Sequence, residues 1–280
     1  MKRVLIVGIT IIYILVAMFG CATSVKGGVD EETQLPSDGT ITGEDDDNQT
    51  VDAPNDGENE QTPEEQPAPA IKYDVMVMSN VNNLNVRSGK GSGYAALGSI
   101  NAKDMLSYVA TEGGWYKVRY KRGYGYVSAS YTQLKYMQMS NNQAVEDVLH
   151  VAKGLMGYPY VWGAQRYHWG NGILNHNFVQ GQFDCSSLVQ YVFFIGAGVV
   201  LDVNTRTQVY QGRTVSELAR GDVMFFTNAD RVGLSGLDRV GHVAIYLGDN
   251  YILHTASDYA VIEPISSLRW SYFIVGKRMI

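Results

Sequence analysis

The sequence predicts an α+β protein with two folded domains, a small all-β domain followed by a mixed domain of helices and strands. Residues 72–136 read as short strands separated by turns, without helical periodicity. From Ala144 onward, apolar residues recur at spacings of three and four, which is typical of an amphipathic helix. The chain has 280 residues and is therefore longer than one typical domain.

The first residues predict export from the cytoplasm. Lys2 and Arg3 precede an apolar run at residues 4–20, which is the charged and apolar pattern of a signal sequence. As a helix, this run would span about 25 Å, less than the bilayer core of about 30 Å, so we expect cleavage. Cys21 follows the run and resembles the lipidated cysteine of bacterial lipoproteins. An uncleaved signal anchor within residues 1–21 is the alternative, and both predict attachment to the outer face of the plasma membrane.

Residues 22–70 are predicted to be an acidic linker that does not fold. From Ser24 to Ala70 there are fourteen acidic residues and one lysine, a net charge of −13, with few large apolar side chains. Such a segment repels itself and stays extended. The remaining residues, 71–280, have a net charge of +5, which suits weak attraction to anionic wall polymers but is an ordinary value.

The predicted all-β domain covers residues 71–138. Its segments LNVRSGKGSGY, GWYKVRY and GYGYVSASYTQL resemble the hallmarks of bacterial SH3-like domains. The resemblance implies a small barrel. Such a domain either binds the cell wall or shapes a substrate channel, and a spacer with a packed core is the alternative.

The second domain, residues 139–280, contains a cysteine in a position suited to catalysis. We expect its first helix to end at Gly157. In the later motif FDCSSLVQYVFF, Asp184 resembles a helix N-cap, which places Cys185 at the start of a helix. The helix N-terminus is expected to favour the thiolate and to lower the pKa of this cysteine.

A second motif, GHVAIYLGDNYILHTAS, predicts two strands joined by a turn at residues 248–250. If the turn has three residues, His242 and His254 lie on the same face of the hairpin, whereas a two-residue turn places them on opposite faces. The prediction of a Cys-His-His triad therefore requires the longer turn. In this triad His242 is the base for Cys185, and His254 fixes the ring of His242. The backbone N–H of Cys185 and the Tyr160 side chain are candidates to stabilise the oxyanion.

Together with GYPYVWGA, these motifs resemble the NlpC-type family of peptidoglycan endopeptidases across residues 141–280. The resemblance implies a papain-like cysteine peptidase domain that uses no cofactor. It also implies that Tyr160, Asp184 and Ser186 lie around the substrate. The expected reaction is hydrolysis of the stem-peptide amide between γ-linked D-glutamate and the following diamino acid, through an acyl-enzyme.

The segment at residues 165–182 is longer than is typical of the family that the sequence resembles. It is predicted to form a loop over the cleft, with a docking surface as the alternative. Its two histidines, His168 and His176, lack nearby cysteines or paired carboxylates, so no metal site is expected.

Two other functions are compatible with the same sequence. One is a catalytically silent wall-binding lipoprotein, and the other is an amidase or acyltransferase on the same fold. The expected partners are peptidoglycan or muropeptides, and the membrane through a lipid or signal anchor. Neither a nucleic-acid partner nor a stable oligomer is expected, and the predicted location is the cell envelope outside the cytoplasm.

Overall fold

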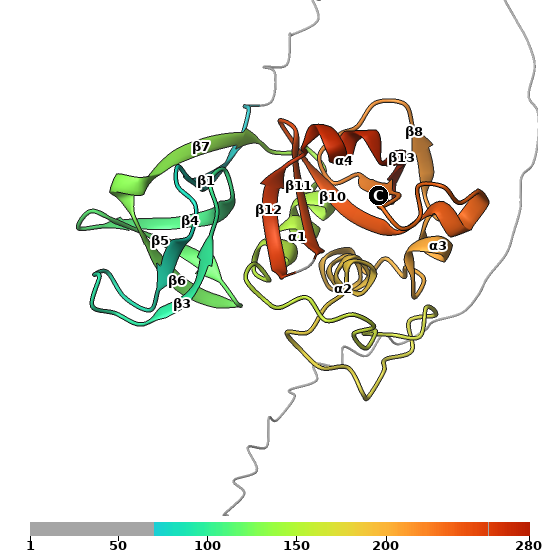
Figure 1. Cartoon of the computed structure of the whole chain (residues 1–280), viewed down its shortest axis with the longest axis horizontal. Coiled ribbons are helices and arrows are strands. Elements are labelled where there is room, and N and C mark those ends of the chain that lie inside the picture. The colour runs from blue at the N-terminus through green and yellow to red at the C-terminus, as the bar shows by residue number, and fades with distance from the viewer. Residues whose placement is uncertain (1–69, 257) are drawn as a thin grey trace, which may run out of the picture. The chain divides into compact units, whose positions relative to one another are not determined.

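The computed structural model describes residues 70–256 and 258–280, which belong to one compact unit (Figure 1). The predicted signal, its Cys21 and residues 22–69 of the predicted linker lie outside the described residues. Within the described part of the chain, no helix is long and apolar enough to cross a membrane.

The N-terminal domain is an antiparallel sheet of seven strands in the order β3-β2-β6-β5-β4-β1-β7. The strands alternate buried and solvent-facing residues, as half-buried strands do, and Val86, Val118 and Val127 are fully buried. This confirms the predicted all-β character. The elements are β1 (Tyr73–Ser79), β2 (Leu84–Arg87), β3 (Ala96–Ile100), β4 (Met105–Glu112), β5 (Trp115–Tyr120), β6 (Gly123–Ser128), the short 3-10 helix η1 (Ala129–Tyr131) and β7 (Thr132–Gln138).

The C-terminal domain packs helices against an antiparallel sheet of six strands in the order β12-β11-β10-β9-β13-β8. Helix α2 lies against α1 and against strands β10 and β11 (Figure 1). The α+β prediction is therefore confirmed. The elements are α1 (Gln143–Lys153), α2 (Cys185–Ala197), α3 (Thr205–Gln208), β8 (Arg213–Val215), β9 (Val223–Phe226), η2 (Gly236–Arg239), β10 (His242–Gly248), β11 (Tyr251–Ala256), β12 (Tyr259–Pro264), α4 (Ser267–Ser271) and β13 (Phe273–Arg278).

Helix α1 is shorter than predicted. It ends at Lys153 with Gly154 as its C-cap, not at Gly157. Leu155 and Met156 continue the apolar pattern, but they are buried in a turn after the helix. Gly157 has a φ of +86°, and a Cβ atom there would overlap the ring of Tyr120 in β5. The close approach of the two domains, in addition to backbone conformation, therefore requires glycine at this position.

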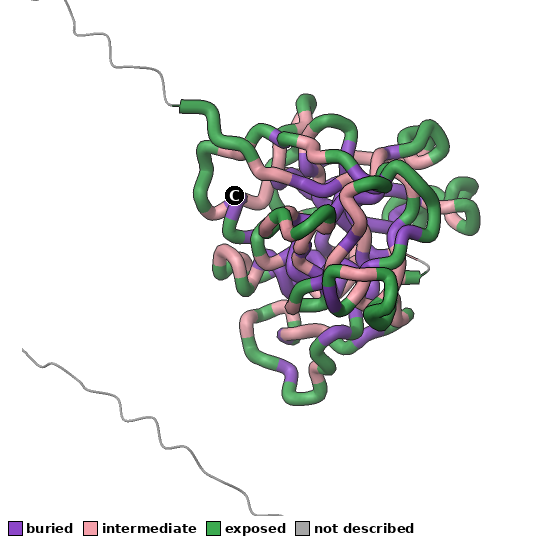
Figure 2. The backbone as a smooth tube through the Cα atoms, turned by 90° about the vertical axis from the view of Figure 1, so that its left-hand side faces the viewer, coloured by how far each residue is buried: buried purple, intermediate pink, exposed green. Residues whose placement is uncertain are grey.

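One hydrophobic cluster contains buried residues from both domains. The buried segments lie in the interior of the molecule (Figure 2). Beside the cluster lies a buried ion network. Asp74 of β1 accepts from Lys153 at 2.6 Å and from Arg220 at 2.7 Å, and Arg220 also donates to Glu146 at 2.7 Å. These four side chains are at most 13% exposed. The network therefore ties β1 of the first domain to the second domain.

Replacing Asp74 with alanine is expected to destabilise the protein strongly. The change leaves Lys153 without its carboxylate partner and removes one of the two carboxylates that Arg220 contacts. Breaking a buried pair in this way costs about 3–5 kcal/mol. Urea or thermal unfolding of the Asp74→Ala variant measures the loss. Lys90→Ala is the control, because Lys90 is 58% exposed in its pair with Glu112, and loss of an exposed pair costs about 0–1 kcal/mol. Equal stability of the two variants would contradict the prediction.

Candidate active site

Cys185 is the first residue of α2, and the start of this helix is tightly fixed. Asp184 is the N-cap, as predicted, and its carboxylate accepts from the Ser187 N–H at 2.8 Å. The Ser187 hydroxyl in turn accepts from the Asp184 N–H at 2.9 Å, which completes a capping box. The cap holds the Cys185 backbone in place and leaves its side chain partly exposed.

The two residues beside Cys185 are held by a residue that the sequence analysis did not select. Arg166 donates to the Asp184 carboxylate at 2.9 Å and to the Ser186 hydroxyl at 3.1 Å. The Ser186 hydroxyl also donates to Asp184 at 3.0 Å, and both residues are almost fully buried. Asp184 and Ser186 line a cavity of about 220 Å³ beside Cys185, but their side chains are already engaged in these contacts. Their part in substrate binding stays a prediction.

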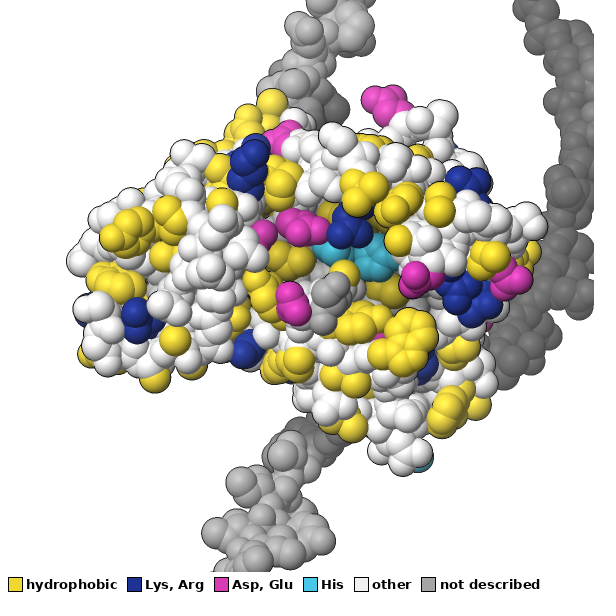
Figure 3. Space-filling model, in the orientation of Figure 1, with side chains coloured by type: hydrophobic (Ala, Val, Ile, Leu, Met, Phe, Trp, Pro, Cys, Tyr) yellow, Lys and Arg dark blue, Asp and Glu magenta, His cyan; other side chains and the backbone are white. Residues whose placement is uncertain are grey.

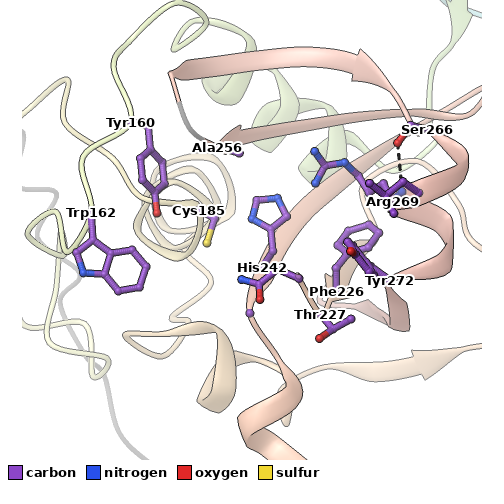
Figure 4. Close-up of a pocket in the computed structure, with 13 residues that line it drawn as sticks. Tyr160, Trp162, Cys185, Phe226, Thr227, His242, Ala256, Ser266, Arg269 and Tyr272 are labelled. Carbon is purple, nitrogen blue, oxygen red and sulfur yellow. Dashed lines mark hydrogen bonds between the residues drawn. The ribbon is translucent and has the colours of Figure 1, made fainter. Parts of the chain in front are cut away.

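The predicted pair of histidines lies side by side. His242 begins β10 and His254 lies in β11, and His242 Nε2 is 3.0 Å from His254 Nδ1. Both imidazoles are buried, with exposures of 9% and 2%. The Nδ1 atom of His242 is thus the ring nitrogen left for a thiol proton. Cys185 and His242 line one cavity of about 380 Å³, and Figure 4 shows the thiol and the imidazole facing each other across it.

The turn between β10 and β11 differs from the prediction, although His242 and His254 do lie on the same face of the hairpin. Asp249 and Asn250 have φ angles of 50° and 64°, which is typical of a two-residue hairpin turn. Gly248 pairs with Tyr251, while Tyr246 pairs with Ile252, so one extra residue forms a β-bulge before the turn. The expected three-residue turn is therefore wrong. The bulge makes up the missing residue and keeps both histidines on one face.

The row of hydrogen-bonded side chains continues beyond the predicted triad. His254 Nε2 lies 2.9 Å from Glu263 Oε1, and Arg269 Nη2 lies 3.1 Å from the same oxygen. Glu263 is in β12, opposite Ile252, and therefore diagonal to His254. Sequence reasoning stopped at the hairpin and missed Glu263. The signal that could have found it is the alternation of YAVIEP, which repeats the pattern of a third strand.

The pKa values of Cys185 and His242 shift in directions that keep both groups neutral. Burial, followed by the charge of Asp184, raises the pKa of the Cys185 thiol to about 12, against the opposing influence of the Val243 N–H, the Ser186 N–H and Arg166. This is opposite to the predicted lowering, because desolvation of a thiolate here outweighs the helix N-terminus. Burial, then His254 and Arg269, lowers the pKa of His242 well below its ordinary value. The resting pair is a thiol beside a neutral imidazole.

Tyr160 lies next to this pair because backbone hydrogen bonds join its segment to the residues just before β12 and just before α2. Its N–H donates to the Asp258 carbonyl at 2.9 Å, and the Val161 N–H donates to the Phe183 carbonyl at 2.9 Å. The Tyr160 side chain points toward Cys185 (Figure 4). Burial, followed by the nearby Cys185 and Asp184, raises the pKa of Tyr160 to about 12, so its hydroxyl keeps its proton and can donate.

The surface around these residues is hollowed. Figure 3 shows histidine side chains at the floor of the hollow, with a Lys or Arg side chain and Asp or Glu side chains beside them. A smaller cavity of about 190 Å³ adjoins His254, and Asn101 and Asp104 of the N-terminal domain line it together with Glu263 and Arg269. The N-terminal domain therefore borders the candidate site.

Residues 165–182 lie elsewhere than predicted. Among them only Arg166 lines the two cavities beside Cys185. Tyr167 and Phe178 pack on Tyr191 of α2, with ring centroids 5.1 and 5.5 Å away. His168 is fully buried against Phe194. The prediction of a loop over the cleft is wrong, because Tyr167, His168 and Phe178 pack this segment on α2 instead.

A thiol at a helix N-terminus, facing an imidazole that a second imidazole orients, is an arrangement capable of nucleophilic attack on an acyl group. Residues 157–279 match the model of the NlpC/P60 family, and residues 82–133 match the bacterial SH3 domain. Residues 157–279 therefore form an NlpC/P60 family domain, and a bacterial SH3 domain precedes it. The family prediction is confirmed.

Curated relatives align with about half of this chain. Peptidoglycan DL-endopeptidase CwlO of Bacillus licheniformis is 32% identical over 136 residues, which is 47% of this chain and 27% of that protein. The γ-D-glutamyl-L-lysine dipeptidyl-peptidase of Bacillus cereus is 27% identical over 44% of this chain and 32% of its own. The chain thus spans less than two thirds of these relatives.

Solved structures also resemble this chain. RipB, a peptidoglycan hydrolase of Mycobacterium tuberculosis, is 30% identical over 49% of this chain and 65% of its own, with a TM-score of 0.38. RipD of the same species, described as a non-catalytic NlpC/p60 domain protein, is 22% identical over 50% of this chain and 99% of its own, with a TM-score of 0.38.

The pKa shifts predict how Cys185 reacts with iodoacetamide. Only the thiolate reacts, so the alkylation rate should rise about tenfold per pH unit from pH 6 to 10, because the thiol pKa is about 12. Mass spectrometry of the labelled peptide measures the rate, and Cys185→Ala gives the background from Cys21. A rate plateau at acid pH would instead indicate a preformed thiolate–imidazolium pair and contradict the prediction.

Proposed function

We propose that this protein hydrolyses an amide bond in peptidoglycan stem peptides, with Cys185 as nucleophile, His242 as base and His254 as the residue that orients it. The observation that carries the proposal is the free thiol facing a buried, neutral imidazole whose other nitrogen lies 3.0 Å from His254. Membership of the NlpC/P60 family supports the same reaction.

The reaction begins from the neutral pair. His242 Nδ1 takes the proton of the Cys185 thiol as the sulfur attacks the carbonyl carbon of the scissile amide. The resulting imidazolium returns this proton to the leaving amine, the C–N bond breaks, and an acyl-enzyme remains. Water, deprotonated by His242, then attacks the thioester, and the carboxylic acid and free thiol are released. His254 accepts from His242 Nε2 throughout and holds the ring orientation.

The negative charge on the carbonyl oxygen requires hydrogen-bond donors at the helix start. The backbone N–H of Cys185 is one, since the first N–H groups of a helix have no partner within it. The Tyr160 hydroxyl is the second, because its raised pKa keeps it protonated and it points toward Cys185. Tyr160 thus stabilises the oxyanion. Asp184 and Ser186 line the adjoining cavity and lie around the bound substrate there.

The bond we propose lies between γ-linked D-glutamate and the following diamino acid. The Bacillus cereus relative named for a γ-D-glutamyl-L-lysine bond supports this choice. The position of the N-terminal domain supports a preference for soluble muropeptides over intact wall. Asn101 and Asp104 border the cavity beside His254 and leave less room for long glycans. Burial raises the pKa of Asp104 to about 6.

The proposed place of action is the cell envelope, outside the cytoplasm. The peptidoglycan endopeptidases among the relatives support this location. Attachment to the plasma membrane through Cys21, or through an uncleaved signal, remains part of the proposal, as does a monomeric state.

Two alternatives share the same fold. A silent wall-binding protein is one, and RipD is a similar chain described as non-catalytic. The presence of Cys185, His242 and His254 in one site favours catalysis here. An amidase at the sugar-peptide junction, or an acyltransferase, is the other alternative, and it differs in the bond cut or in the group that accepts the acyl chain.

Digestion of purified peptidoglycan and of soluble muropeptides by the full chain tests the proposal. We expect mass spectrometry to detect new fragments that end in D-glutamate, and we expect the muropeptides to be cut faster than the intact wall. The Cys185→Ala and His242→Ala variants should lose at least about 10³-fold in rate. The matched control is His176→Ala, because His176 is exposed and lies outside the cleft.

Other products would favour the alternatives. Fragments cut at the sugar-peptide junction would indicate the amidase, and products bearing an added amine would indicate acyl transfer. Binding of both substrates without any cleavage would indicate the silent wall-binding protein.

A further inference from the structure

The row of hydrogen-bonded side chains across β10, β11 and β12 contains a carboxylate beyond the proposed triad. His254 Nε2 lies 2.9 Å from Glu263 Oε1, on the side of the ring opposite His242. The His254 side chain is 1% exposed and the Glu263 side chain 31% exposed. The interaction is therefore shielded on the histidine side and reaches solvent only at the carboxylate.

Glu263 is ionised in this environment. Burial raises the pKa of its carboxyl group, but the hydrogen bond with His254 and the charge of Arg269 outweigh burial and hold it below the usual value. Arg269 Nη2 lies 3.1 Å from the same Oε1 atom. An ionised carboxylate only accepts hydrogen bonds, so His254 must donate from Nε2.

The hydrogen bond with Glu263 also determines which ring nitrogen carries the proton in His254 and in His242. Burial lowers the pKa of His254, so the ring is neutral and carries one proton. With that proton on Nε2, His254 Nδ1 is an acceptor, and His242 must donate to it from Nε2. His242 Nδ1 is then unprotonated and faces the Cys185 thiol as a base. The opposite set of tautomers satisfies the contact between the two histidines equally well, but it places a proton on His242 Nδ1 and blocks the base.

We propose that Glu263 is a positioning residue of this site, which selects the tautomers of His254 and His242 that leave a base facing Cys185. Arg269 supports it by holding the carboxylate ionised and in place. The inference rests on the proposed function for its catalytic consequence, but the tautomers themselves are a property of the folded protein.

Other charged and titratable groups face the same cavity and are part of its electrostatics. Asp104 of the N-terminal domain adds a negative charge when ionised, and Asp258 and Tyr259 belong to the segment that enters β12. None of these three contacts a histidine ring nitrogen within hydrogen-bonding distance, whereas Glu263 does. The selection of tautomers is therefore assigned to Glu263 alone.

The first test uses the native protein. Nitrogen-15 NMR of the full chain, labelled at histidine, distinguishes protonated from unprotonated ring nitrogens at neutral pH. We expect His254 and His242 both to carry the proton on Nε2, with assignment from His254→Gln and His242→Gln spectra. A proton on Nδ1 of either residue would overturn the proposal, whether or not the protein cuts peptidoglycan.

The second test removes the acceptor. Glu263→Met keeps the length of the side chain but accepts no strong hydrogen bond. We expect kcat on muropeptides to fall about 100-fold or more with little change in KM, since a triad imidazole held in the wrong tautomer loses up to about 10⁴-fold. Glu263→Gln keeps an acceptor oxygen and should recover most of this loss. The NMR spectrum of Glu263→Met should show a signal from a proton on His242 Nδ1.

The matched control is Glu112→Met. Glu112 also lies in a strand, is 31% exposed like Glu263 and pairs with a basic residue. It differs from Glu263 in belonging to the N-terminal domain. Its kcat should stay within about twofold of the native value. If Glu263→Met matches this control in kcat and keeps the native tautomers, the proposal is wrong. If native protein cuts no substrate, the proposed function fails, and the NMR of native and Glu263→Met protein still decides the role of Glu263.

Discussion

The register of three neighbouring strands is the constraint on which the candidate site depends. In an antiparallel sheet, side chains on one face meet directly or diagonally across strands. Two such diagonal contacts, one between β10 and β11 and one between β11 and β12, bring His242, His254 and Glu263 into one row. A shift of one residue in either pairing would move a member of the row to the other face. The β-bulge before Gly248 prevents such a shift, and it is therefore as important to the site as the histidines themselves.

The second component of the site is the start of α2, which faces this row. The capping box of Asp184 and Ser187, together with Arg166, fixes the first turn of the helix. Helix α2 packs on β10 and β11, so the position of Cys185 relative to His242 follows from the packing of helix on sheet. The environment is dry enough that desolvation outweighs the helix N-terminus. The thiol and the imidazole are therefore both neutral at rest.

The two domains share a buried ion network and a hydrophobic cluster, and this arrangement has a consequence for the site. Asp74 of β1 contacts Lys153 and Arg220 of the second domain. The N-terminal domain lies beside β12, which contacts β4. From there Asn101 and Asp104 reach the cavity next to His254 and Glu263. The bacterial SH3 domain thus lines the cavity beside His254 and Glu263, and its position there depends on the ion network and the hydrophobic cluster that attach it to the second domain.

The sequence by itself determined what depends on local patterns: the strands of the first domain, the N-cap at Asp184, and the family whose motifs surround Cys185 and His242. Alternation and capping are properties of neighbouring residues, so a single chain reveals them. Only the tertiary structure decided the features that depend on distant residues. The two-residue turn with its bulge, the contact of Glu263 with His254, and the packing of residues 165–182 on α2 all arise from pairing between segments. The raised pKa of Cys185 belongs with them, because desolvation depends on everything that surrounds the thiol, whereas the helix N-terminus is visible in the sequence.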